Sequence, residues 1–124
     1  VLFRSRDTRE ARDGTVSLDP QGRMVLLLPA ELTAANSAAY RERVAALRAQ
    51  LREDGRAPTE IIVDASGLRF IDSAGAGLLV GTAKWARDGA VSMRAIGFGD
   101  TPRRILRVAR LDWLLADPVA LPGR

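Results

Sequence analysis

The sequence contains neither cysteine nor histidine. Without cysteine the chain can form no disulfide and no thiolate metal site. Without histidine it lacks the residue that most often serves as a general base, as a zinc ligand and as a phosphohistidine carrier. These absences exclude a Ser-His-Asp triad. Catalysis would have to rest on carboxylates, hydroxyls, Tyr40 or Lys84.

Long apolar runs are also missing. No stretch approaches the length needed to cross a bilayer, and no pattern of basic, apolar and small-residue zones marks a signal peptide. The 124 residues predict one domain that buries roughly 65% of the surface of its unfolded chain. We therefore expect a cytoplasmic protein without membrane insertion.

Basic residues exceed acidic ones, which gives a formal net charge of +4, and all but one of the 19 basic residues are arginine. Such a balance is compatible with nucleic-acid binding. The arginines of the expected helices alternate with acids, however, as in Arg41-Glu42-Arg43, and no aromatic platform or recognised DNA-binding motif accompanies them. We interpret the charge as a solvated surface and expect no direct nucleic-acid partner.

Turn signals and apolar runs predict a single α/β domain at residues 14–117. Residues 1–13 have few apolar positions, so we expect a disordered arm or an expression remnant there, and the stretch 118–124 is expected to be a C-terminal tail. An initial hairpin supplies antiparallel strand pairing and helical crossovers supply parallel pairing. Together they predict a mixed β-sheet.

Strands and helices are expected to alternate after the hairpin. Strands are predicted at 15–18, 24–28, 60–63 and 91–96, and helices from a Thr33 or Asn36 cap to about 53, from 73 to about 87, and after a Thr101 cap. The continuous apolar run at 24–28 predicts a strand that is covered on both faces. Residues 111–115 could form a short strand or an irregular segment.

Asp72 and Ser73 mark the point where a strand-like pattern changes to a helical one. Asp is a preferred helix N-cap, and Ser73 then occupies the first helical position, where backbone N–H groups are unpaired and the helix dipole is positive. A hydroxyl at that position lies where phosphate binds well. The pattern alone permits two interpretations: a capped helix start that serves packing only, and a phosphoacceptor serine.

Three glycines, Gly75, Gly77 and Gly81, lie within the first turns of this expected helix. Each costs roughly 1 kcal/mol relative to alanine in a helix interior, which predicts close approach of the helix to the sheet or to a partner. Their spacing is not the full dinucleotide-binding pattern. Asp64 and Asp72 have no third ligand at a clear spacing, so we expect no metal site.

The segment Ile-Ile-Val-Asp at 61–64, followed by Phe-Ile-Asp-Ser-Ala-Gly-Ala-Gly at 70–77, resembles the signature of the STAS domain. This domain is shared by anti-sigma-factor antagonists and the cytoplasmic parts of sulfate transporters. The resemblance extends from residue 15 to about residue 115, and Glu31-Leu32 resembles the middle of the family's Gly-Glu-Leu-Asp loop. It implies a STAS-like fold, with helices packed mainly on one face of the sheet.

The resemblance to antagonists implies a phosphoprotein that regulates transcription by partner switching, and neither an enzyme nor a cofactor-binding protein. Its partner would be an anti-sigma factor that is also an ATP-dependent kinase and phosphorylates Ser73. The unphosphorylated protein would bind this kinase, the phosphorylated protein would dissociate, and a separate serine phosphatase would restore it. The implied partner-binding residues are Glu31, Thr33, Asp72, Ser73, Ala74, Ala76 and Gly77.

Two departures from the family pattern accompany the resemblance. Thr33 replaces the usual aspartate of the Gly-Glu-Leu-Asp loop, and the usual final helix is shortened or absent. Two other functions remain open. One is an accessory subunit of an ABC-type lipid transporter that binds the ATPase without a phosphorylation switch. The other is a sensor or scaffolding module of a stress-response complex.

Overall fold

The computed structural model describes residues 14–123, so the arm predicted at 1–13 and the terminal Arg124 lie outside the described part of the chain. The described strands are β1 (Thr15–Leu18), β2 (Met24–Leu27), β3 (Glu31–Leu32), β4 (Ile61–Asp64), β5 (Phe70–Ile71) and β6 (Met93–Ile96). The described helices are α2 (Ser37–Glu53), α3 (Ser73–Asp88), α4 (Asp100–Val108) and a 3₁₀ helix, η2 (Asp112–Leu115).

Four strands form the main sheet in the order β1-β2-β4-β6. The β1 and β2 strands are antiparallel, whereas β4 is parallel to β2 and to β6. This result confirms the single α/β domain with a mixed sheet, the initial hairpin and the parallel crossovers. The strands β3 and β5 form a separate two-stranded parallel ladder.

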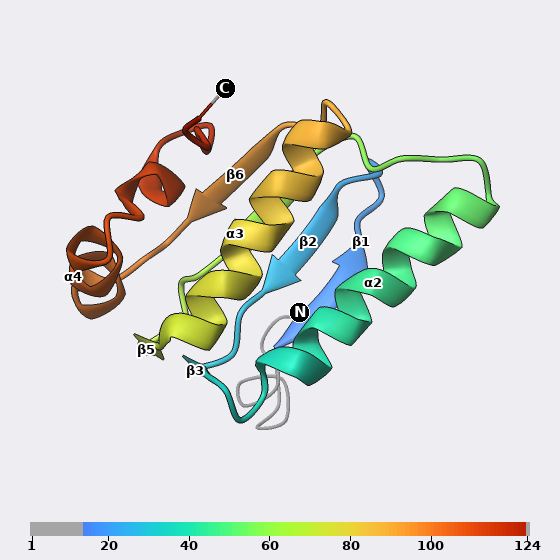
Figure 1. Cartoon of the computed structure of the whole chain (residues 1–124). Helices are drawn as coiled ribbons and strands as arrows, with labels where there is room; N and C mark the ends of the chain where they lie inside the picture. The colour runs from blue at the N-terminus through green and yellow to red at the C-terminus, as the bar shows by residue number, and fades with distance from the viewer. Residues whose placement is uncertain (1–13, 124) are drawn as a thin grey trace.

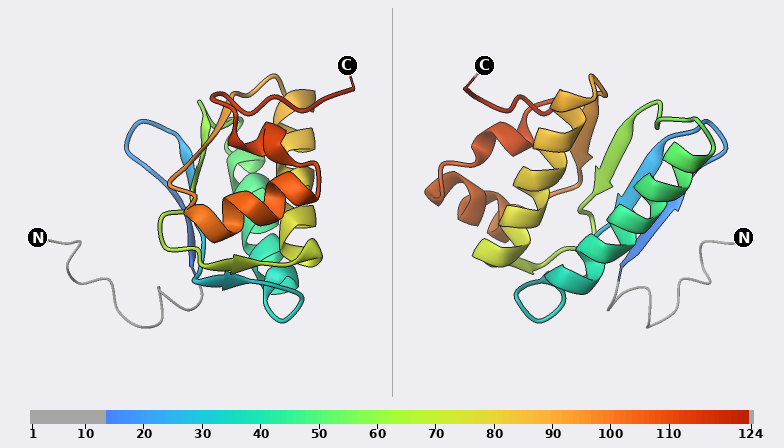
Figure 2. Two further views of the ribbon diagram at one scale, coloured as in Figure 1. Left: turned by 90° about the vertical axis from the view of Figure 1, so that its left-hand side faces the viewer. Right: turned by 45° about the vertical axis from the view of Figure 1, so that its right-hand side comes forward.

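The helices of the described part lie on one side of the main sheet, where α2 and α3 run next to each other (Figure 1) and no helix covers the far side (Figure 2). In β2, Met24 and Leu26 are fully buried in the core. On the other face of the strand, Val25 is half-buried and Leu27 is 8% exposed. The prediction that this strand is covered on both faces therefore holds for the core face and for Leu27, but not for Val25.

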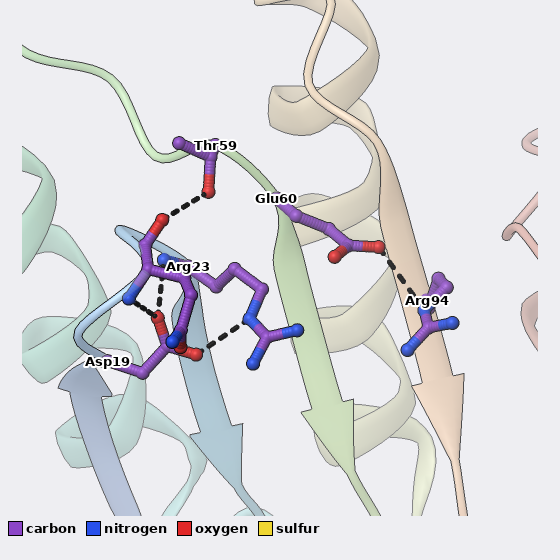
Figure 3. A network of polar contacts seen from close by, with 6 residues as sticks. Asp19, Arg23, Thr59, Glu60 and Arg94 are labelled. Atoms are coloured by element: carbon purple, nitrogen blue, oxygen red, sulfur yellow. Dashed lines mark hydrogen bonds and ion pairs between the residues drawn. The ribbon is translucent and has the colours of Figure 1, made fainter.

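Polar contacts fix the sheet at the end where β4 begins (Figure 3). Asp19 accepts hydrogen bonds from the backbone N–H and the Nε of Arg23, at 2.9 and 2.7 Å, which close the β1–β2 turn. The Thr59 hydroxyl donates to the Gln21 carbonyl at 3.1 Å and so ties this turn to the chain before β4. An ion pair of 3.2 Å between Glu60 and Arg94 joins β4 and β6.

The chain after β6 differs from expectation in two places. The N-cap of α4 is Gly99 rather than Thr101, because the helix already begins at Asp100. Pro102 is tolerated in the first turn of this helix, since backbone N–H groups there have no intrahelical partner. The segment 111–115 is neither strand nor irregular but contains η2. Leu114 of η2 is fully buried in the core, so apolar burial explains this local helix.

Candidate functional site

The short β3–β5 ladder brings together two parts of the chain that are distant in sequence. Glu31 pairs with Phe70 and Leu32 pairs with Ile71, in parallel register. The loop after β3 and the start of α3 therefore lie side by side at one end of the helix layer (Figure 1). The sequence did not reveal β3, because two residues are too short for a strand pattern.

Asp72 links these two segments through its carboxylate. One oxygen, Oδ1, accepts a hydrogen bond from the backbone N–H of Gly75 at 3.0 Å, which is the predicted N-cap of α3. The other oxygen, Oδ2, accepts from the backbone N–H of Ala34 at 3.0 Å. These bonds, from Gly75 first and then from Ala34, lower the pKa of Asp72. Asp72 is thus both the helix cap and the connection to the loop after β3.

Ser73 lies at the first position of α3 and is exposed. Its hydroxyl makes no hydrogen bond to any of residues 14–123. At a helix N-terminus the unpaired backbone N–H groups and the helix dipole favour negative charge. The site therefore offers a free hydroxyl to a modifying group and an electrostatic environment that suits a phosphate on it.

Gly75 shows why the first turn of α3 contains glycine. A Cβ atom at this position would lie directly against the carbonyl oxygen of Leu32 and 2.9 Å from Cγ1 of Ile71. The helix thus packs against the β3–β5 ladder, as the close-approach interpretation predicts. A Cβ atom at Gly77 or Gly81 would meet nothing within 4 Å, so packing inside the fold does not account for these two glycines.

The residues implied by the family pattern do not all lie on one surface. Glu31, Ser73 and Gly77 are exposed, whereas Thr33, Asp72 and Ala74 are half-buried. Ala76 is only 6% exposed and belongs to the hydrophobic core, because it lies on the side of α3 that faces the sheet. The structure therefore removes Ala76 from the surface that a partner can contact.

The loop after β3 is ordered by Asn36, a residue that sequence reasoning considered only as a helix cap. Asn36 is the N-cap residue of α2, but its side chain makes no capping bond. Instead, its Oδ1 accepts from the Thr33 N–H at 2.9 Å and its Nδ2 donates to the Glu31 carbonyl at 2.8 Å. The Thr33 hydroxyl accepts from the Ala35 N–H at 3.2 Å and does not cap α2. The loop thus keeps a defined shape with threonine in place of the usual aspartate.

Phe70 and Arg69 are two further exposed residues beside the site that the motif did not indicate. The Phe70 ring is 44% exposed at the pairing position opposite Glu31. Arg69 lines a shallow hollow of about 250 Å³ together with residues of the loop after β3. Alternation along a two-residue strand could not predict this exposure. Within residues 14–123 no group of acidic side chains is arranged to hold a metal ion.

The chain belongs to the STAS domain family, whose pattern it matches over residues 14–120. Its fold is similar to that of the anti-sigma factor antagonist SpoIIAA, at 22% identity and a TM-score of 0.58 in two solved forms. The match covers 75% of this chain and 80% of SpoIIAA in the unphosphorylated form, and 82% and 87% in the phosphorylated form of the Bacillus protein.

Two other solved structures share the fold. A candidate anti-sigma factor antagonist from Thermotoga maritima is 18% identical, with a TM-score of 0.64 over 82% of this chain and 81% of that one. SLC26A9 is also 18% identical, with a TM-score of 0.64 over 85% of this chain but only 19% of the SLC26A9 chain. No curated protein matches the chain significantly in sequence. In the described part of the chain, no helix is both long and apolar enough to cross a membrane.

Proposed function

We propose that the protein is an anti-sigma-factor antagonist that binds an anti-sigma factor kinase and is released when Ser73 is phosphorylated. The observation that carries this proposal is the exposed Ser73 hydroxyl at the start of α3, which makes no hydrogen bond within the described residues. A Bacillus relative of the same fold, SpoIIAA, is known in phosphorylated and unphosphorylated forms.

The surroundings of Ser73 explain how one phosphate could control binding. Phosphorylation adds about −1.5 to −2 charges and three strong acceptor oxygens. The start of α3 stabilises this charge within the protein itself. A partner that covers Ser73 and the exposed Gly77 one turn later would have to desolvate the phosphate, which is costly without a matching cation. Phosphorylation would therefore leave the fold intact and weaken the complex.

In this proposal the protein supplies no catalytic group. The kinase is the ATP-dependent anti-sigma factor, and a separate serine phosphatase removes the phosphate in the cytoplasm. The surface around Ser73 is formed by Glu31, Thr33, Asp72 and Ala74. Asp72 holds the loop after β3 against the start of α3, and the bonds of Asn36 fix the shape of that loop. Partner switching then regulates transcription, because an anti-sigma factor that is bound to the unphosphorylated protein releases its sigma factor.

The test combines phosphorylation with binding. Incubation with ATP and the cognate anti-sigma factor should add one phosphate to Ser73, as read by mass spectrometry. In calorimetry, Ser73→Ala should retain binding, whereas Ser73→Asp should weaken it at least tenfold, about 1.4 kcal/mol. Ser92→Asp is the matched control, because Ser92 is exposed at the other end of the sheet, before β6. Equal affinities for the two aspartate variants, or capture of a transporter ATPase in place of the kinase, would contradict the proposal.

A further inference from the structure

A groove runs along the outer surface between α2 and α3. It consists of two adjacent hollows of about 180 and about 150 Å³, and Arg48 and Trp85 line both of them. The first hollow has an apolar base that includes Val44 and Leu78. Gly81 also lines it and leaves open space, since a Cβ atom there would meet nothing within 4 Å.

Arg48 occupies the middle of this groove in a constrained position. Its guanidinium carbon lies 4.1 Å from the centre of the Trp85 ring, at a distance typical of a cation–π contact. Its Nε is buried and has no hydrogen-bond partner among residues 14–123. A buried donor of this kind costs free energy unless an acceptor reaches it. The groove thus contains a fixed cation with unused hydrogen-bonding capacity.

The positive charge of the groove is mostly without an ion-pair partner among residues 14–123. The ionisable residues that line it are all arginines, namely Arg41, Arg48, Arg52 and Arg56. Only Arg56 has an ion pair within the described residues, a 3.6 Å contact to Asp54. Burial, and then repulsion from Arg52, lowers the pKa of Arg48. Arg48 and Arg52 therefore repel each other beside the apolar base, and a ligand with carboxylates would relieve this repulsion.

The length of the groove fits a helix. Arg41 and Arg52 lie eleven positions apart on α2, which is about 16 Å at 1.5 Å per residue. An amphipathic helix of three turns has this length and can place an apolar stripe on the base and acids beside it. Leu78 lies five positions after Ser73, so the groove begins about 7 Å along α3 from the candidate phosphoacceptor.

We propose that this groove receives an acidic amphipathic helix of the anti-sigma factor, as a second contact beside the one at Ser73. The inference rests on the proposed function. The apolar side of that helix packs on Val44, Leu78 and Trp85, and its carboxylates pair with Arg41 and Arg48. The Ser73 surface then determines when the partner binds, and the groove contributes affinity and selects partners with the complementary charge.

The experiment compares two groove variants with a control in calorimetric titrations with the cognate anti-sigma factor. Arg41→Glu reverses an exposed charge, and Gly81→Leu extends an apolar side chain from a position where a Cβ atom meets nothing within 4 Å. Each should weaken binding about tenfold or more, and Arg41→Glu should also reduce the dependence of affinity on salt. Arg104→Glu, an equal charge change at an exposed position of α4, should bind within twofold of the wild type.

The outcomes separate the two proposals. Wild-type protein that binds and is phosphorylated at Ser73, together with groove variants of unchanged affinity, would overturn the groove assignment alone. Equal weakening by Arg104→Glu would also overturn it, because the effect would then be one of net charge. If wild-type protein neither binds the anti-sigma factor nor accepts phosphate from it, the proposed function fails and the groove assignment fails with it. The melting temperature of each variant is compared with that of the wild type. An unchanged value shows that a loss of affinity does not come from unfolding.

Discussion

Replacement of glycine by alanine should have opposite effects at two positions of α3 that are only two residues apart. At Gly75 the new methyl group would lie against the Leu32 carbonyl and 2.9 Å from Cγ1 of Ile71. At Gly77 it would meet nothing within 4 Å. The same chemical change therefore tests whether the start of α3 is packed against the β3–β5 ladder.

The magnitudes follow from the surroundings of each position. Overpacking against backbone atoms costs typically about 1 to 3 kcal/mol, and at Gly75 the backbone oxygen of Leu32 cannot rotate away as a side chain could. At Gly77, alanine gains about 0.5 to 1 kcal/mol from helix propensity, since the position is inside the helix and exposed. We expect Gly75→Ala to lower the free energy of unfolding by about 2 kcal/mol and Gly77→Ala to raise it slightly.

Urea unfolding followed by circular dichroism measures both changes, and thermal unfolding should show a Tm lowered by roughly 6 to 12 °C for Gly75→Ala. Gly81→Ala serves as a second open position with the same expectation as Gly77→Ala. Equal stability of the Gly75→Ala and Gly77→Ala variants would refute the close packing of α3 on the ladder. It would also refute the view that packing inside the fold, rather than contact with a partner, explains the glycine at position 75.

Two further predictions concern the contacts that hold the site and the sheet. Tyr40→Phe should destabilise the protein by about 1 to 3 kcal/mol in urea unfolding, because the buried hydroxyl lies 2.9 Å from the carbonyl oxygens of both Thr15 and Leu27; an unchanged midpoint would show that these contacts contribute nothing. The pKa of Asp72 is lowered, so its contribution to stability is complete above about pH 4 and is lost as the pH falls through the folded-state value. The difference in Tm between wild type and Asp72→Asn should therefore shrink between about pH 6 and about pH 3, and a constant difference would argue against an ionised cap.

Rules about local sequence predicted the elements whose hydrogen-bonding partners lie close together in the chain. The hairpin turn at 19–22 contains its own hydrogen-bonding partners, and Asp72 caps the helix that follows it directly in sequence. Features that depend on distant partners were not predictable in this way. Examples are β3, which exists only because it pairs with β5, and η2, which forms where Leu114 enters the core.

The candidate site shows the same division. Motif and capping rules located Ser73 and Asp72, but the bond from Ala34 to Asp72 joins residues 38 apart, and sequence periodicity carries no information about such a contact. The side of α3 on which each small residue lies also depends on packing. The family resemblance named both Ala76 and Gly77 as partner-binding residues, yet a helix turns by about 100° per residue, and this rotation places Ala76 in the core.

If Ser73 is phosphorylated as we propose, the contact between Asp72 and Ala34 bears on which copies of the protein the kinase can recognise. Pairings between segments distant in sequence form late in folding, because the intervening chain must first be ordered. A nascent chain, or one in which the loop after β3 has opened locally, therefore presents Ser73 on a start of α3 that has lost its bond to Ala34. Under the proposed function, a kinase that requires the folded start of α3 would act only on copies whose β3–β5 ladder is complete.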